Sequence, residues 1–199
     1  SFDAQLELCL CAERSGIESM LMAIGFTRPD PLLLSVALGP RTETVKFLVA
    51  CRAGLFSPTA FVQQVNTASH LIGGRIAINM VTGHTPGELR YYGPCLSHDE
   101  RYEQQDEFLQ VCRSLWRRDG EVHFVGRHYQ GEGGVVGNRF ASAEGAPEIY
   151  LGGTSPQAAE IAARHASCLW QIAEAPDRLR SVAARLRKHG TELGLLVAL

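Results

Sequence analysis

The stretch RIAINMVTGHTPGELRYYG, from Arg75 to Gly93, joins a strand pattern to an abrupt polar ending. Its first part, 76–81, is a short apolar run typical of a strand that is buried on both faces. Asn79 interrupts that run, and from Thr82 onward the sequence is polar and aromatic. Because ligands of parallel α/β folds bind at the carboxyl ends of the strands, this ending predicts the rim of a ligand pocket.

Helical and strand patterns alternate through the rest of the chain. Asp30 and Ser57 each precede a proline, which makes them predicted helix N-caps. Short apolar strands separated by helices form parallel sheets. Six such strands fit either a doubly wound sheet or most of a (β/α)8 barrel, and the pattern leaves both open. Helices are predicted at 3–14, 30–38, 58–71, 98–116, 155–164 and 176–189, and strands at 17–23, 44–51, 76–81, 148–151, 168–172 and 193–199.

We expect one domain over residues 1–199, with an excursion from the main sheet at about 120–147. Within the excursion, runs at 121–124 and 128–130 predict a hairpin, and a glycine-rich segment follows it. No repeat or linker divides the chain. The chain begins in a helical pattern without methionine and ends in a strand pattern, so we expect both ends to be cut.

The composition is that of an ordinary globular protein, with 45% hydrophobic and 20% charged residues and a net charge of −2. No apolar run approaches the roughly 18 residues of a membrane span, and no secretory signal pattern is present. A slightly acidic balance without a basic stripe argues against nucleic acid. The six cysteines lack zinc spacing, so we expect no metal site. We expect buried, reduced thiols in a cytoplasmic protein, with Cys9 and Cys11 in the core.

The segment Gly152-Gly153-Thr154-Ser155-Pro156 lies between a predicted strand and a predicted helix. Glycines let the backbone approach a ligand closely, and a helix start offers N–H groups and the positive end of its dipole. The pattern indicates either a phosphate-binding loop or a tight turn with a Ser/Thr cap and no ligand. Rossmann spacing and a Walker lysine are both missing. A phosphate held here therefore suits a mononucleotide such as FMN better than a triphosphate with magnesium.

Asn79 and the segment that begins at His98 carry further polar groups toward the strand ends. A buried Asn79 amide needs partners, because an unpaired polar group costs about 1–3 kcal/mol. A flavin ring edge, a neighbouring strand or a water molecule would each supply them. His98 and Tyr102 stand four residues apart and share one helix face, so both can point at one site. The acidic residues between them are equally typical of a solvated first helical turn.

Taken together, these segments resemble the bacterial luciferase-like flavin monooxygenases, and within them the alkanesulfonate monooxygenases. Each matching stretch is short, but their order and spacing hold from the first residue to the last. The matching stretches are KFLVA at 46–50 with Arg52, SPT at 57–59, GR at 74–75, NMVTG at 79–83, EL at 88–89, HDERYE at 98–103, EF at 107–108, GRHY at 126–129, PEIYLGGTS at 147–155 and EAP at 174–176.

The resemblance implies a luciferase-like (β/α)8 TIM barrel that is incomplete, with its first strand and C-terminal part missing. It implies reduced FMN (FMNH2) from a separate NAD(P)H-dependent flavin reductase, O2 as co-substrate, and oxygenation through a flavin C4a-peroxide. The implied substrate is an alkanesulfonate or a related small organic molecule, and we expect a homo-oligomer. The implied flavin contacts are Asn79, Thr82, His98 and Tyr102, and the implied phosphate-loop residues are Gly152, Gly153, Thr154 and Ser155.

Two sites depart from the alkanesulfonate monooxygenases. Arg28 stands where they carry a small or thiol side chain near the flavin, and Leu196 and Ala198 fall on the positions of a paired arginine and histidine. Arg28 is therefore a candidate replacement for the anion-binding charge, and Arg28 and His98 are the candidate catalytic residues. Two other interpretations stay open. One is a truncated, non-catalytic flavin-binding homologue, and the other is a monooxygenase module of a larger biosynthetic enzyme.

Overall fold

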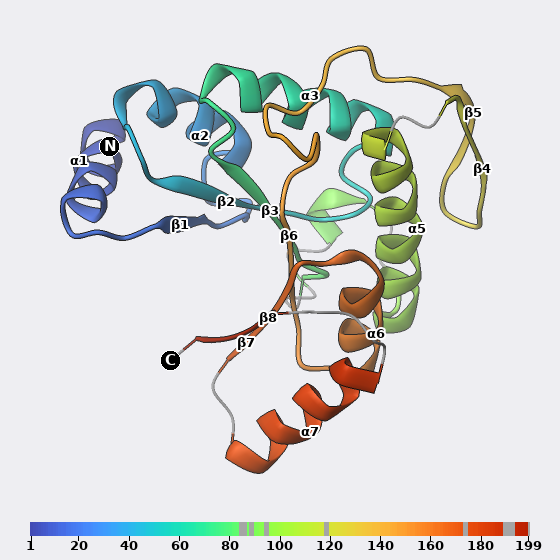
Figure 1. The fold of residues 1–199 in the computed structure, drawn as a ribbon. Helices are drawn as coiled ribbons and strands as arrows, with labels where there is room; N and C mark the ends of the chain where they lie inside the picture. The colour runs from blue at the N-terminus through green and yellow to red at the C-terminus, as the bar shows by residue number, and fades with distance from the viewer. Residues whose placement is uncertain are drawn as a thin grey trace.

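Six parallel strands form one curved sheet in the computed structural model of the chain (Figure 1), which describes residues 1–83, 87, 90–93, 96–117, 120–172, 175–188 and 194–198. Their order across the sheet is β1-β2-β3-β6-β7-β8, so each of the six strands pairs with the next of the six, and the order never reverses. A doubly wound sheet reverses its order at a switch point. The arrangement is that of an incomplete (β/α)8 barrel. The strands are β1 (Ser19–Met22), β2 (Lys46–Cys51), β3 (Ile76–Met80), β6 (Ile149–Gly152), β7 (Cys168–Ile172) and β8 (Gly194–Ala198).

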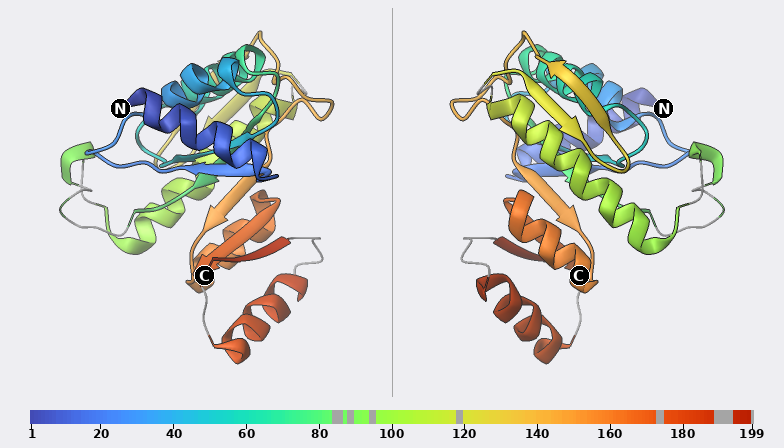
Figure 2. Two further views of the ribbon diagram at one scale, coloured as in Figure 1. Left: turned by 90° about the vertical axis from the view of Figure 1, so that its left-hand side faces the viewer. Right: turned by 90° about the vertical axis from the view of Figure 1, so that its right-hand side faces the viewer.

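The helices follow one another around the outside of the curved sheet (Figures 1 and 2). Three of them begin as the sequence predicts, because Asp30, Ser57 and Ser155 each accept a hydrogen bond from a backbone N–H three residues on. In each case a proline occupies the first helical position. The helices are α1 (Phe2–Arg14), α2 (Pro31–Leu38), α3 (Pro58–Leu71), α5 (His98–Arg117), α6 (Pro156–His165) and α7 (Pro176–Lys188), with short 3-10 turns η1 (Gly39–Arg41) and η2 (Arg90–Tyr92).

The core lies between the central strands and the helices that cover them. All five residues of β3 are buried, and Phe47 and Leu151 on the flanking strands are fully inaccessible. On the helix side Phe61 of α3 and Phe108 of α5 pack with their ring centroids 5.2 Å apart. These contacts make the carboxyl ends of the strands a fixed platform.

Arg75 holds the opposite end of β3. Its guanidinium donates to the carbonyl oxygens of Gly39, Thr42 and Val45 at 2.8–3.0 Å, and to the Thr42 hydroxyl at 3.0 Å. These bonds tie the entry of β3 to the turn that leads into β2. The stretch from Arg75 to Gly93 thus begins with a residue that anchors β3 and ends with polar residues.

The hairpin predicted in the excursion is present, with its second strand later than expected. Strands β4 (Val122–Val125) and β5 (Gln130–Gly134) pair antiparallel in a separate two-stranded sheet, outside the helix layer (Figure 2). The segment that follows returns across α3, where the Asn66 amide donates to the carbonyl oxygen of Asn138 at 2.9 Å. Val136 and Phe140 are buried in this return.

The cysteine predictions hold in part. Cys9, Cys51 and Cys112 are buried free thiols, but Cys11 is exposed. The prediction of a core Cys11 is wrong, because two helical residues turn through about 200° and place it on the face opposite Cys9. Among the described residues no helix is long and apolar enough to cross a membrane, and no group of His, Cys, Asp and Glu side chains is arranged to hold a metal ion.

Candidate functional site

A cleft of about 600 Å³ opens at the carboxyl ends of β1, β2, β3, β6 and β7, beside the first turn of α5. Parallel strands end at one edge of a sheet, so residues far apart in sequence meet there. All the residues predicted to contact a flavin or its phosphate line this one cleft, as do several that the sequence did not single out. The predicted ones are Asn79, Thr82, His98, Tyr102, Gly152, Gly153, Thr154 and Ser155, and the others include Arg52, Arg101, Trp170 and Gln171.

The two glycines at the end of β6 are required by close packing. A β-carbon on Gly152 would lie 3.0–3.3 Å from the Trp170 indole. One on Gly153 would lie 2.7 Å from the β-carbon of Ala158 in α6 and 3.1 Å from the Tyr102 hydroxyl oxygen. Neither glycine is among those with a positive φ. The sequence therefore uses glycine here to bring the loop against α5 and α6, and backbone handedness is not the reason.

Ser155 closes the loop as the N-cap of α6. Its hydroxyl oxygen accepts a hydrogen bond from the Ala158 N–H at 3.1 Å, as expected for a Ser/Thr helix cap. Thr154 beside it is exposed. The positive end of the α6 dipole faces the same loop, so the cap and an anion site are compatible. Gln171 of β7 also holds this loop, because its side-chain amide donates to the Gly153 carbonyl oxygen at 3.0 Å.

Asn79 has a partner that the sequence did not identify. It is 1% exposed, and its amide oxygen accepts from the indole N–H of Trp170 at 2.7 Å. Trp170 stands two strands away on β7, and its indole lies where a side chain on Gly152 would be. The sequence did carry a signal for this partner, namely a tryptophan and a glutamine inside the apolar strand 168–172. Polar groups in a buried strand are expected to have hydrogen-bond partners.

The first turns of α5 present His98, Arg101 and Tyr102 to the cleft, as their spacing along one helix face requires. Tyr102 is 5% exposed, and its ring centroid lies 5.1 Å from that of His98 in an edge-on contact. His98 is more open, and its Nδ1 lies 2.9 Å from the Asp99 carboxylate. An imidazole that donates from Nδ1 keeps Nε2 as an acceptor while neutral.

Arg28 lies apart from these residues. It is exposed in the loop after β1, where its backbone N–H donates to the Gly25 carbonyl oxygen at 3.0 Å, and it is not among the described residues that line the cleft. The catalytic role of Arg28 stays a prediction. The arginines that do line the cleft are Arg52, at the end of β2 and 8% exposed, and Arg101. Leu196 lies on β8 in register with Trp170.

Comparison with known proteins agrees with this fold. The chain matches the family model of the luciferase-like monooxygenases over residues 1–196. Its structure is similar to EDTA monooxygenase from Chelativorans sp. BNC1, with a TM-score of 0.86 and 21% identity over 100% of this chain and 57% of that one. The long-chain alkane monooxygenase LadA gives a TM-score of 0.86 and 24% identity over 100% and 57%. The structure of the riboflavin lyase RcaE with modified FMN and riboflavin gives a TM-score of 0.84 and 20% identity, over 100% of this chain and 55% of that one.

Proposed function

The chain belongs to the luciferase-like monooxygenase family, and from this premise we propose that its strand-end cleft binds reduced FMN for the oxygenation of a small organic substrate by O2. The observation that carries the proposal is the meeting of Asn79, Thr82, the His98–Tyr102 pair and the 152–155 loop in one cleft. The chain spans 57% of the length of EDTA monooxygenase and 57% of the length of LadA. The activity is therefore proposed for this cleft, in the chain or in the protein that contains it.

The cleft suits FMN in size, shape and charge. Its volume of about 600 Å³ lies within the range of roughly 300–1,000 Å³ usual for cofactor pockets. The loop at Gly152 and Gly153 lacks side chains that would fill the space beside α6. The helix start and the Arg52 and Arg101 guanidiniums supply positive potential for a phosphate and for an anionic reduced ring.

The proposed roles follow from the positions of the groups. Thr154 and Ser155, at the start of α6, would hold the phosphate. Asn79, at the strand ends, would contact the ring. Because the Trp170 N–H occupies the Asn79 amide oxygen, the amide NH2 is the group that remains to donate to a ring carbonyl. His98 also lines the cleft and is a candidate catalytic residue from the sequence; we propose that its Nε2 acts as a proton acceptor.

Reduced FMN, when bound, supplies the electrons that activate O2. The contribution of the chain is to bind and orient the cofactor. We further propose an alkanesulfonate or related small substrate, a separate NAD(P)H-dependent flavin reductase as electron source, a homo-oligomeric state and a cytoplasmic location. Relatives of this fold include an EDTA and a long-chain alkane monooxygenase. Substrate choice therefore varies on one scaffold.

Anaerobic titration of the purified protein with reduced FMN, followed by air and a series of short alkanesulfonates, tests this function. We expect saturable binding, followed by sulfite release that depends on both protein and reduced flavin. Binding that ends only in hydrogen peroxide with every sulfonate would contradict oxygenation and favour a flavin-binding homologue. Absence of binding would reject the cleft as a flavin site. Arg28→Ala belongs in the same series, because unchanged binding and turnover would remove Arg28 from the reaction.

A further inference from the structure

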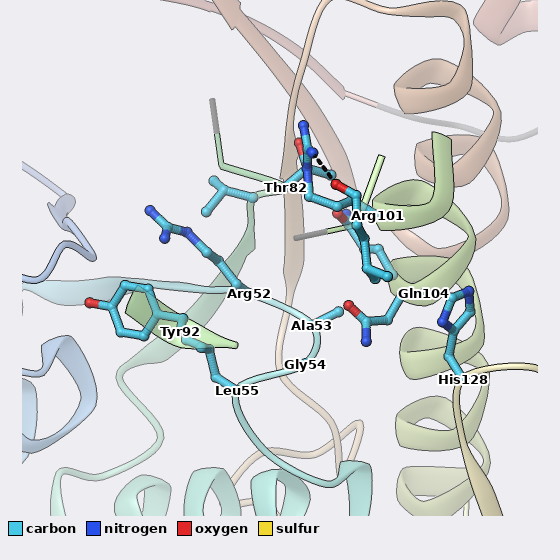
Figure 3. Close-up of a pocket in the computed structure, with 12 residues that line it drawn as sticks. Arg52, Ala53, Gly54, Leu55, Thr82, Tyr92, Arg101, Gln104 and His128 are labelled. Atoms are coloured by element: carbon cyan, nitrogen blue, oxygen red, sulfur yellow. Dashed lines mark hydrogen bonds between the residues drawn. The ribbon is translucent and has the colours of Figure 1, made fainter. Parts of the chain in front are cut away.

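A second, smaller cavity of about 150 Å³ adjoins the cleft (Figure 3). The two spaces share Arg52, Val81, Thr82 and Arg101, so a molecule in the cleft has direct access to the smaller cavity. Its walls come from the loop after β2, from α5 and from the β4–β5 loop. Figure 3 shows Gln104 and His128 on the α5 side of this space.

Gln105 is the most unusual group in this wall. It is 1% exposed, and neither its amide oxygen nor its amide nitrogen has a hydrogen-bond partner among the described residues. Arg101 Nε and His128 Nε2 belong to residues that line the same cavity. Both atoms are also buried, and neither has a hydrogen-bond partner among the described residues. Buried polar atoms are nearly always paired in folded proteins. Several unpaired atoms around one cavity therefore indicate a polar occupant.

The charge of the wall selects the occupant. Arg52 and Arg101 bring two guanidiniums, and His128 adds a ring N–H donor, whereas no described residue of the wall carries a carboxylate. The Glu103 carboxylate lies 3.8 Å from His128 Nε2, but it is already paired with Arg127 at 2.7 Å. A cavity with cationic and neutral donors and no acid is complementary to an anion.

The donors are held in place before any ligand arrives. Arg101 Nη1 donates to the Leu96 carbonyl oxygen at 2.9 Å, the dashed line in Figure 3. The Arg52 guanidinium stands over the Tyr92 ring, 5.5 Å from its centroid. The loop that carries His128 is fixed by the Glu107 carboxylate, which accepts three successive backbone N–H groups at 2.8–3.1 Å. Such preorganisation favours binding because little ordering is left for the ligand to induce.

We propose that this cavity is the subsite for a small oxyanion group of the substrate, such as a sulfonate or carboxylate. The reacting part of the substrate then lies in the adjoining cleft. The inference rests on the proposed function, which it deepens by assigning the place where the anionic group of the substrate binds. The volume of about 150 Å³ equals roughly five waters at about 30 Å³ each, enough for such a group and too small for a flavin. Gln105 and Arg101 are the specificity residues of this subsite.

The test compares methanesulfonate with dimethyl sulfone, its neutral isostere, by calorimetric titration of the flavin-free protein in chloride-free buffer. We expect methanesulfonate to bind at least tenfold more tightly than the sulfone. Gln105→Met, which keeps the volume without the amide, should weaken methanesulfonate binding about tenfold. A control is Gln110→Met on the exposed side of α5, where binding should stay within twofold. Gln105→Glu provides a second variant, with similar shape but a repelling charge, and should abolish anion binding.

A titration of the same samples with FMN separates this inference from the proposed function. We expect the Gln105 variants to bind FMN within twofold of the unchanged chain, because Gln105 does not line the larger cleft. Equal binding of sulfone and sulfonate, no sulfonate binding, or unchanged sulfonate binding in folded Gln105 variants would overturn the subsite and leave the flavin site standing. Loss of FMN binding in the unchanged chain would instead reject the proposed function.

Discussion

Replacing Gly153 with alanine is the sharpest test of the loop at the end of β6. The added β-carbon would lie 2.7 Å from the Ala158 β-carbon, about 0.7 Å inside the 3.4 Å at which ordinary contact begins. Ala158 is fully buried in α6, so this contact cannot be relieved by rotating a flexible side chain. The second contact, 3.1 Å from the Tyr102 hydroxyl oxygen, pushes against α5. The first turn of α6 must therefore shift outward.

Overpacking of this kind costs about 1–3 kcal/mol. If the same shift displaces the N–H groups around Ser155 from the phosphate, FMN affinity falls by about 5- to 150-fold, at 1.4 kcal/mol for each factor of ten. Fluorescence titration with FMN measures this affinity, and a thermal melt measures stability. Gly131→Ala is the matched control, because nothing lies within 4 Å of its added β-carbon and its φ is not positive.

We expect the control to bind FMN normally and Gly153→Ala to lose both affinity and thermal stability. A folded Gly153→Ala protein with FMN affinity within twofold of the unchanged chain would refute the reasoning. It would mean either that the loop absorbs the extra carbon without moving or that the phosphate binds elsewhere.

Three further predictions concern the supporting structure. Trp170→Phe removes the indole donor to Asn79, so FMN affinity should fall about 2- to 10-fold, one neutral hydrogen bond being worth about 0.5–1.5 kcal/mol; unchanged affinity in titration would contradict the role given to this pair. Gly74→Ala, at φ +78° with its β-carbon against the Ala141 carbonyl oxygen, should lower the unfolding free energy by about 1–3 kcal/mol in urea denaturation. Burial alone would raise the pKa of Glu107, but three backbone N–H donors outweigh it and hold the pKa below its ordinary value. Its contribution to stability is therefore complete above about pH 4.3 and is lost as pH falls through the folded pKa. Glu107→Gln should flatten the acid limb of the stability–pH curve, and an identical curve would exclude this source.

Much of the fold was predictable because its signals are local. The cap-and-proline pairs at Asp30 and Ser57 mark helix starts that the structure reproduces, and the apolar run at 168–172 is β7 residue for residue. The choice between a doubly wound sheet and a barrel was not predictable from the pattern. Strand order depends on which strands pair, and pairing is a long-range property that periodicity does not encode.

The sequence predicted that the site lies at the strand ends, but it did not predict which side chains pair with one another there. Asn79 was identified as a buried amide in need of a partner, but its bond to Trp170 crosses from β3 to β7 and requires the bare backbone of Gly152 between them. Arg28 was chosen by position in the resemblance, yet the loop after β1 places it in solvent. Arg101 was passed over because a charge in the first turn of a helix is usually a solvated one.

The central claim is that the cleft holds a flavin by its phosphate, beside Thr154 and Ser155 at the start of α6. The direct measurement is the ratio of the dissociation constants of reduced riboflavin and reduced FMN, determined anaerobically on one preparation. Riboflavin carries the same ring without the phosphate. Charge-assisted hydrogen bonds contribute about 1.5–3 kcal/mol each, so FMN should bind at least about tenfold more tightly. Equal affinities for the two flavins would contradict the account.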